Sequence, residues 1–152
     1  MAKGYSKQEL RDSGLFLKLR TGAALGESHQ LTLLWRDPAG RAMGLQARSI
    51  LSKDELKEKG WPAYLYSSGL KKSEGLVGLE SARGAKELIM VEGPLDALSI
   101  QAKGLPAVAL GGTSLSPAQV KALQANRTEE ILLALDRDEA GRQATERAIQ
   151  TL

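Results

Sequence analysis

In the stretch Leu132-Leu133-Ala134-Leu135-Asp136-Arg137-Asp138-Glu139-Ala140-Gly141-Arg142, two carboxylates follow a run of apolar residues and precede a helical pattern. A short apolar run bounded in this way predicts a buried strand over Glu130–Leu135 and a helix from Glu139 to the end of the sequence. Residues i and i+2 of an extended chain point to the same side, so Asp136 and Asp138 are expected to aim at one point.

The same order of features occurs earlier in the chain. The apolar strand predicted at Glu87–Val91 is followed by Glu92-Gly93, and Asp96 lies at the start of a helix predicted over Leu95–Lys103. Open parallel sheets place their ligand sites at the carboxyl ends of the strands. The chain has no Cys and one His. Carboxylates that converge without softer ligands favour a hard cation, most naturally Mg²⁺, and such a site usually handles phosphate.

Alternating strands and helices continue between these two segments. A strand is predicted at Pro106–Leu110, followed by the turn Gly111-Gly112-Thr113-Ser114 and by a helix that Ser116 caps and that ends near Ala125. Repeated units of this kind imply an α/β fold with a parallel sheet and right-handed crossovers.

The first half is less regular and predicts a smaller mixed α+β subdomain. Alternating runs flank the turn Asp37-Pro38-Ala39-Gly40, which predicts a β-hairpin of Leu31–Arg36 and Ala42–Ile50. Four further elements are expected: a short helix at Ser6–Asp12 ended by Gly14, a helical turn at Ser52–Lys59, a strand at Tyr64–Tyr66 and a connector at Leu70–Gly84. We therefore expect two domains, residues 1–84 and residues 85–152.

Composition and charge bound the protein class. A chain of 152 residues with 42% hydrophobic residues can bury one core. It has no apolar run long enough for a membrane span and no signal-peptide pattern, so a cytoplasmic protein is expected. Residues 1–86 carry 15 Lys or Arg and 9 Asp or Glu, a net charge of +6, whereas residues 87–152 carry 6 and 9, a net charge of −3. Either two solvated surfaces differ by chance, or a basic half gathers a polyanion beside an acidic half that holds metal.

Each acidic residue also has a simpler interpretation. Glu92 can be an exposed side chain in an ordinary strand–helix turn, and Asp96 suits the first turn of any helix because the helix dipole favours acid there. Asp136 and Asp138 can be a surface acid and a helix cap. Two like charges at one strand end repel each other unless a cation neutralises them, however, and Glu92 at the equivalent end of another strand favours a shared metal site.

Other residues are candidate ligand contacts. The turn Gly111–Ser114 lies between a strand and a helix, a position that can present backbone N–H groups to an anion. Arg142 can reach phosphate or lie on a helix surface. Arg48, Lys71 and Lys72 are basic, and each alone is more often a solvated charge than a ligand contact.

Taken together, these segments resemble the Toprim domain of bacterial-type, DnaG-like DNA primases. The likeness is carried by the Glu92-Gly93 turn, the turn that contains Gly112-Thr113-Ser114, and the Asp-x-Asp-x-Ala-Gly-Arg segment at residues 136–142. Upstream segments resemble the primase catalytic core in the same order: residues 10–15, residues 35–48, Pro62-Ala63-Tyr64-Leu65-Tyr66-Ser67-Ser68 (Pro-Lys-Tyr-Leu-Asn-Ser in the family) and residues 72–79.

The resemblance implies a fold, an activity and a set of roles. The fold is a parallel Rossmann-like sheet flanked by helices. The activity is metal-dependent synthesis of primers on single-stranded DNA from nucleoside triphosphates. Glu92 resembles the catalytic acid, Asp136 and Asp138 the pair that binds Mg²⁺ or Mn²⁺, and Asp96 an acid that supports the same site. The expected nucleotide or nucleic-acid contacts are Arg48, Lys71, Lys72, Gly93, Gly112, Thr113 and Arg142.

The chain departs from the family pattern in several places. Ala63 stands where the family usually has Lys, which weighs against nucleotide binding there. No zinc-binding module precedes the core, and no further Asp-rich segment or helical subdomain follows it. On these grounds the sequence predicts a fragment or trimmed core of a phage, plasmid or other mobile-element primase, with a replicative helicase fused or bound to it.

Other functions stay open. A Toprim topoisomerase or nuclease is the second enzyme class, but a topoisomerase needs a catalytic tyrosine from another domain, and the upstream segments favour primase. A non-catalytic nucleic-acid-binding Toprim module and a receiver-like acidic pocket are further alternatives.

Overall fold

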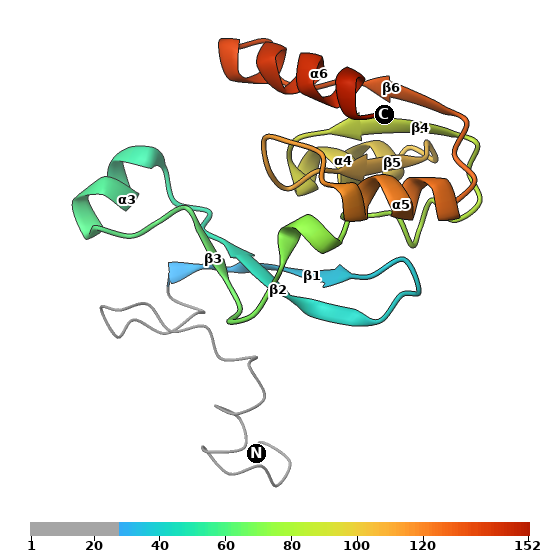
Figure 1. Ribbon diagram of the computed structural model, residues 1–152. Coiled ribbons are helices and arrows are strands. Elements are labelled where there is room, and N and C mark those ends of the chain that lie inside the picture. The colour runs from blue at the N-terminus through green and yellow to red at the C-terminus, as the bar shows by residue number, and fades with distance from the viewer. Residues whose placement is uncertain (1–27) are drawn as a thin grey trace, which may run out of the picture. The chain divides into compact units, whose positions relative to one another are not determined.

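The computed structural model describes residues 28–152, so the expected helix at Ser6–Asp12 and the likeness at residues 10–15 lie outside the described part. The elements, in chain order, are β1 (Leu31–Arg36), β2 (Ala42–Arg48), α3 (Lys53–Lys59), β3 (Tyr64–Tyr66), the 3₁₀ helix η1 (Lys72–Glu74), β4 (Glu87–Val91), α4 (Pro94–Gln101), β5 (Ala107–Ala109), α5 (Pro117–Ala125), β6 (Glu130–Leu133) and α6 (Glu139–Thr151) (Figure 1). Within residues 28–152, no helix is long and apolar enough to cross a membrane.

Contacts divide the described chain into two compact units. The first unit comprises residues 28–35 and 43–70, and the second comprises residues 36–42 and 71–152. Each unit contains its own three-stranded sheet. The expected domain boundary between residues 84 and 85 stays a prediction.

The second unit is built on a parallel sheet in the order β5-β4-β6. The central strand β4 pairs with both neighbours, so that Met90 is in register with Val108 on one side and with Leu133 on the other. Helices α4 and α5 connect the three strands, and α6 follows the last one. The predicted α/β fold with a parallel sheet flanked by helices is therefore confirmed.

One face of this sheet packs into the main apolar core. Leu88 and Met90 lie two residues apart on β4. They belong to one buried cluster with Val108 of β5, Leu110 just after it, and Leu123 of α5. Because side chains two apart in a strand share a face, this spacing buries one side of the sheet against the helix. Burying one such side chain stabilises the fold by about 1.5–3 kcal/mol.

The segment expected to be a connector, Leu70–Gly84, is instead part of this core. Leu76, Leu79 and Ala82 are buried in the cluster, and Val77 forms an antiparallel bridge with Ala109. The prediction was wrong because the Gly, Ser and charged residues of the segment obscured four buried apolar positions with irregular spacing: Leu76, Val77, Leu79 and Ala82.

Gln119 ties the same segment to the sheet. Its side chain is 1% exposed, and Nε2 donates to the carbonyl oxygens of Lys72 (3.2 Å), Gly75 (2.8 Å) and Leu110 (3.2 Å). Gln119 also completes a capping box, because its Oε1 accepts from the backbone N–H of Ser116 while the Ser116 hydroxyl accepts from the N–H of Gln119. One buried side chain thus fixes both the start of α5 and the path of η1.

The first unit holds the sheet β1-β2-β3, in which β2 and β3 pair antiparallel. The predicted hairpin is present as the neighbouring strands β1 and β2, although β2 ends at Arg48 and not at Ile50. Trp35 is 1% exposed, and its indole Nε1 donates to Oε1 of the buried Gln46 at 2.8 Å. His29 is also buried, with one ring nitrogen 2.9 Å from the hydroxyl of Ser28 and the other 2.9 Å from the carbonyl oxygen of Pro62. Burial lowers the pKa of His29, and the contact with Pro62 opposes that shift. We therefore interpret His29 as a structural residue of this unit.

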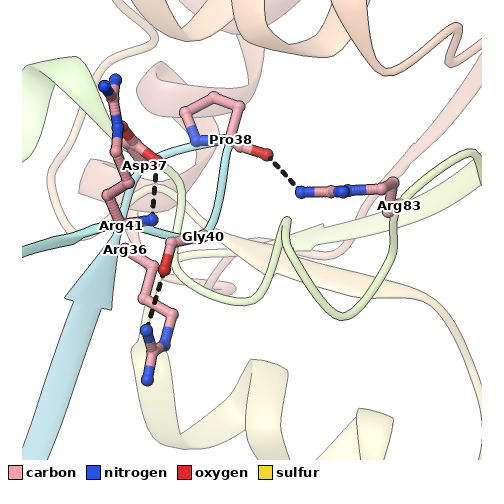
Figure 2. A network of polar contacts seen from close by, with 6 residues as sticks. All are labelled: Arg36, Asp37, Pro38, Gly40, Arg41 and Arg83. Atoms are coloured by element: carbon pink, nitrogen blue, oxygen red, sulfur yellow. Dashed lines mark hydrogen bonds and ion pairs between the residues drawn. The ribbon is translucent and has the colours of Figure 1, made fainter.

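By its contacts, the hairpin turn belongs to the second unit. Figure 2 shows the polar contacts around this turn. Asp37 accepts from the backbone N–H of Arg41 at 2.9 Å and from its Nε at 2.7 Å, and these bonds lower the pKa of the Asp37 carboxyl. Gly40 has φ +85°, a conformation that favours glycine. Arg36 donates to the carbonyl oxygen of Gly40 at 2.8 Å, and Arg83 donates to that of Pro38 at 3.1 Å. The turn is therefore held by hydrogen bonds from Arg36 and Arg41, which flank it in sequence, and from the more distant Arg83.

Candidate metal centre

Glu92 follows the last residue of β4, the middle strand of the parallel sheet (Figure 1). Its carbonyl oxygen accepts from the backbone N–H of Gly111, just beyond β5, at 3.1 Å. Its carboxylate Oε1 accepts from the backbone N–H of Asp136, beyond β6, at 3.4 Å. Glu92 is therefore bonded to the loops that follow both neighbouring strands, at the edge where parallel sheets place ligand sites.

Gly93 and Asp96 lie directly after Glu92. Gly93 is the N-cap of α4 in an extended conformation, and Pro94 occupies the first turn, where its missing N–H costs no helical hydrogen bond. A Cβ at Gly93 would overlap Oδ2 of Asp96. The Asp96 carboxylate therefore folds back over Gly93 at the end of β4, and a side chain at residue 93 would require that flexible carboxylate to move.

Asp136 and Asp138 have different local roles in the loop after β6. The strand ends at Leu133, two residues earlier than predicted, and the chain bends at Arg137 and Asp138. Asp138 is the N-cap of α6, and its Oδ1 accepts from the backbone N–H of Gly141 at 2.8 Å. Asp136 is exposed. The interpretation of Asp138 as a helix cap thus holds, and its second carboxylate oxygen is the one that a ligand would use.

Gly141 fixes the shape of that loop. A Cβ at this position would overlap the carbonyl oxygen of Asp136 and approach its carbonyl carbon to 2.7 Å. Real Cβ atoms essentially never come so close to backbone, so only glycine allows α6 to begin against the Asp136 backbone. The spacing between the acids and the glycine is therefore a packing requirement.

The acidic residues suit a hard divalent cation by their chemistry. Within residues 28–152, no three His, Cys, Asp or Glu side chains lie together closely enough to hold one metal ion as they stand. Mg²⁺ usually keeps several waters and takes only one or two carboxylates from the protein. Glu92 could supply one such carboxylate, and the hydrogen bond to its Oε1 holds the backbone of Asp136 beside it.

Two arginines of α6 contact the loops that follow β5 and β6. Arg142 donates from Nη1 to the carbonyl oxygen of Arg137 at 3.2 Å and pairs with Glu139, whose pKa it lowers. Arg147 donates to the carbonyl oxygen of Thr113 at 3.2 Å and so connects α6 to the loop after β5. The sequence suggested no role for Arg147, because a helix surface position gives no sign of the loop it faces.

The predicted loop Gly111–Ser114 follows β5, and Gly111 has φ +63°. Leu115 and Ser116 separate it from α5, so its backbone N–H groups are not those of the helix N-terminus. Gly112 and Thr113 are exposed. They stay candidate contacts of a nucleotide.

The predicted basic contacts fall in both units. Arg48 ends β2 in the first unit. Lys71 and Lys72 belong to the second, where Lys71 pairs with Glu74 at 2.9 Å and the carbonyl oxygen of Lys72 accepts from Gln119. Because the Lys72 backbone is held by a buried amide, the start of η1 has a defined position within its unit.

Tyr64 and Tyr66 are exposed on β3 near Arg48. No functional role was predicted for these two residues from the sequence. The signal was present, since two aromatic residues that are two apart in a predicted strand share a face.

Comparisons with known proteins agree with this arrangement. Residues 89–152 match the Toprim-like family. The DNA primase of Deinococcus radiodurans is 32% identical in an alignment of 153 residues. The alignment covers 94% of this chain and 26% of that protein. The chain thus spans about a quarter of the length of this relative.

Solved primase structures have the same fold. The Aquifex aeolicus primase, with its zinc-binding and RNA polymerase domains, matches with a TM-score of 0.71 and 28% identity over 95% of this chain and 36% of the solved one. The DnaG primase catalytic domain bound to single-stranded DNA matches with a TM-score of 0.71 and 27% identity over 95% and 45% of the two chains. The chain therefore contains a Toprim domain of the DnaG-like DNA primase type, preceded by a segment similar to the upstream part of the primase catalytic core.

Proposed function

We propose that the chain is the core region of a DNA primase-type nucleotidyltransferase, which joins nucleotides into primers on single-stranded DNA. The observation that carries this proposal is the bonding of Glu92 to the loops after β5 and β6, at the carboxyl edge of a Toprim sheet. The similarity to bacterial primases and to a primase domain bound to single-stranded DNA supports it.

In this proposal Glu92, Asp136 and Asp138 hold Mg²⁺ or Mn²⁺, with Asp96 supporting them. When bound, the metal orients the phosphates of a nucleoside triphosphate and offsets the charge that develops during transfer. Glu92, at the end of the central strand, is suited to accept the proton of the attacking hydroxyl. Gly93 follows β4, Gly112 and Thr113 lie in the loop after β5, and Arg142 lies in α6. All four are assigned to the nucleotide.

Arg48, Lys71 and Lys72 are assigned to the phosphates of the template or of the incoming nucleotide. Basic side chains bind single strands through phosphate contacts without sequence preference. The division into residues 1–84 and 85–152, the mobile-element origin and a fused or bound helicase remain further predictions of the same proposal.

A primer-synthesis assay tests it. The chain is incubated with single-stranded DNA, labelled nucleoside triphosphates and Mn²⁺ or Mg²⁺, and products are resolved on a denaturing gel. We expect short products from the wild type and none from Glu92→Gln. Relaxed supercoils or a cleaved template would favour the topoisomerase or nuclease class. Metal-independent DNA binding without products would favour a non-catalytic module.

A further inference from the structure

An aromatic and basic patch lies on the antiparallel sheet of the first unit. Tyr64 and Tyr66 are two apart on β3, so their side chains leave the strand on the same face. Their rings are nearly parallel, with 24° between the planes and 6.5 Å between the centroids. Arg48 of β2 is in register with Tyr64, and its guanidinium carbon lies 4.8 Å from the centroid of that ring.

Both rings are accessible to a ligand. Tyr64 is 36% exposed and Tyr66 is 39% exposed, whereas Trp35 of the same sheet is 1% exposed. A tyrosine phenol is uncharged at neutral pH, since its ordinary pKa is about 10. Partial burial and the neighbouring Tyr64 raise the pKa of Tyr66 further. A neutral ring does not repel a passing phosphate chain, and the Arg48 charge attracts it.

Exposed aromatic rings beside a basic side chain are the means by which proteins bind single-stranded nucleic acid without reading its sequence. Every base has a π-face that can stack on an aromatic ring, and basic groups follow the backbone. We propose that Arg48, Tyr64 and Tyr66 form a stacking platform for a nucleobase, with Tyr66 as the residue that distinguishes this chain. The inference rests on the proposed function, since it names a contact for the single strand or for a nucleotide.

Two differences from the family pattern point the same way. In the Pro-Lys-Tyr-Leu-Asn-Ser stretch that this segment resembles, Ala63 replaces the Lys and Tyr66 replaces the Asn. The chain therefore lacks a positive charge at one position and gains a ring three residues later. In this proposal, the ring at residue 66 adds a stacking surface to a segment that has no positive charge at residue 63.

Paired oligonucleotides test the platform. A labelled oligothymidylate and an abasic strand with the same number of phosphates differ in bases but not in charge. We expect the wild type to bind oligothymidylate more tightly by fluorescence anisotropy. Tyr66→Leu should weaken that binding about tenfold and leave the abasic strand unaffected. Tyr66→Phe should retain wild-type affinity, because stacking needs the ring and not the hydroxyl.

Trp61→Leu is the matched control. It removes an aromatic ring of the same unit that also lies beside a cation, since Lys59 Nζ is 5.3 Å from the Trp61 centroid, and it should change neither affinity. Tyr64→Leu is a second platform variant with the same expectation as Tyr66→Leu. Thermal melting confirms that each variant is folded.

The source of the base follows from competition. Thymidine triphosphate that displaces oligothymidylate from the wild type would assign the platform to a nucleotide, and its failure to do so would assign the platform to the strand. Equal affinity of the wild type for both oligonucleotides, or unchanged binding by folded Tyr66→Leu and Tyr64→Leu, would overturn the platform and leave the proposed function standing. A wild type that binds neither oligonucleotide, nor thymidine triphosphate, overturns both.

Discussion

The carboxylate of Glu92 accepts a hydrogen bond from the backbone N–H of Asp136, with 3.4 Å between nitrogen and oxygen. This bond joins two acidic residues that are far apart in sequence. Glu92 contributes its side chain to the bond, and Asp136 contributes its backbone. The position of Asp136 is therefore linked to the Glu92 side chain, whereas its own carboxylate is left to face solvent.

Substitutions of Glu92 should separate this structural role from metal binding. Glu92→Gln keeps an oxygen that can accept from the Asp136 N–H, so its melting temperature should match that of the wild type while Mg²⁺ binding is lost. Glu92→Ala should lose both, with the loop bond worth about 1 kcal/mol. Melting curves and Mg²⁺ titration by NMR measure the two effects. Equal Mg²⁺ affinity of Glu92→Gln and wild type would remove Glu92 from the metal site.

Asp136→Asn should weaken Mg²⁺ binding and raise the metal-free stability. Removing one of several like charges at the strand ends relieves repulsion by on the order of 0.5 kcal/mol at an exposed position. Mg²⁺ titration followed at the amides of Glu92, Gly93, Asp136 and Asp138 measures the first effect, and urea unfolding the second. Glu130→Gln, at the other end of β6, is the control and should not alter Mg²⁺ binding. A less stable metal-free Asp136→Asn would mark the residue as structural.

Arg48→Ala and Lys72→Ala should each weaken single-stranded DNA binding and flatten its salt dependence. Loss of one phosphate contact lowers the slope of log affinity against log salt by about 0.7 for a single strand. Affinities measured over a range of NaCl concentrations give the slope. Lys121→Ala, on the exposed side of α5, should leave it unchanged. A slope that survives both basic substitutions would remove these residues from the template contacts.

Gln119→Leu should destabilise the protein by about 2–4 kcal/mol. The substitution keeps an apolar body in the core but leaves three carbonyl oxygens without the amide that they accept from, and it breaks the capping box. Urea unfolding measures the loss. Gln124→Leu, an exposed position on the same helix, should change stability little. Similar unfolding curves for the two variants would contradict the structural role of Gln119.

Asp37→Asn should reduce the acid sensitivity of the fold. The bonds from Arg41 depress the folded-state pKa of Asp37, so its stabilising effect is present above the unfolded pKa, near 3.8, and is lost as the pH falls through the lower folded value. The melting temperatures of wild type and variant should therefore differ at pH 6 and converge toward pH 2. A constant difference across that range would show that the Asp37 charge has no part in the turn.

The sequence was sufficient where local pattern determines structure. The strand predicted at Glu87–Val91 has the same bounds in the structure, and Ser116 caps α5 as expected, because alternation and capping are local properties. The strand predicted to end at Leu135 ends at Leu133, since the Asp138 cap and the contact at Gly141 bend the chain earlier.

Tertiary contacts explain what the sequence could not give. The burial of Leu76 and Leu79 depends on packing against α5 and the sheet, and the bond from Arg147 to Thr113 depends on where α6 lies. No local pattern encodes either contact. The roles assigned to the acidic residues were argued from spacing and resemblance, and they stay predictions until a metal titration is made.

Gly141 offers a way to separate geometry from chemistry in a library of variants. A side chain there would displace the Asp136 backbone, so glycine should return at residue 141 even when clones are selected only for folding. The exposed carboxylate of Asp136 has no such packing requirement and should be retained only when clones are selected for activity. Sequencing the survivors of both selections would show which positions of this loop are constrained by shape and which by function.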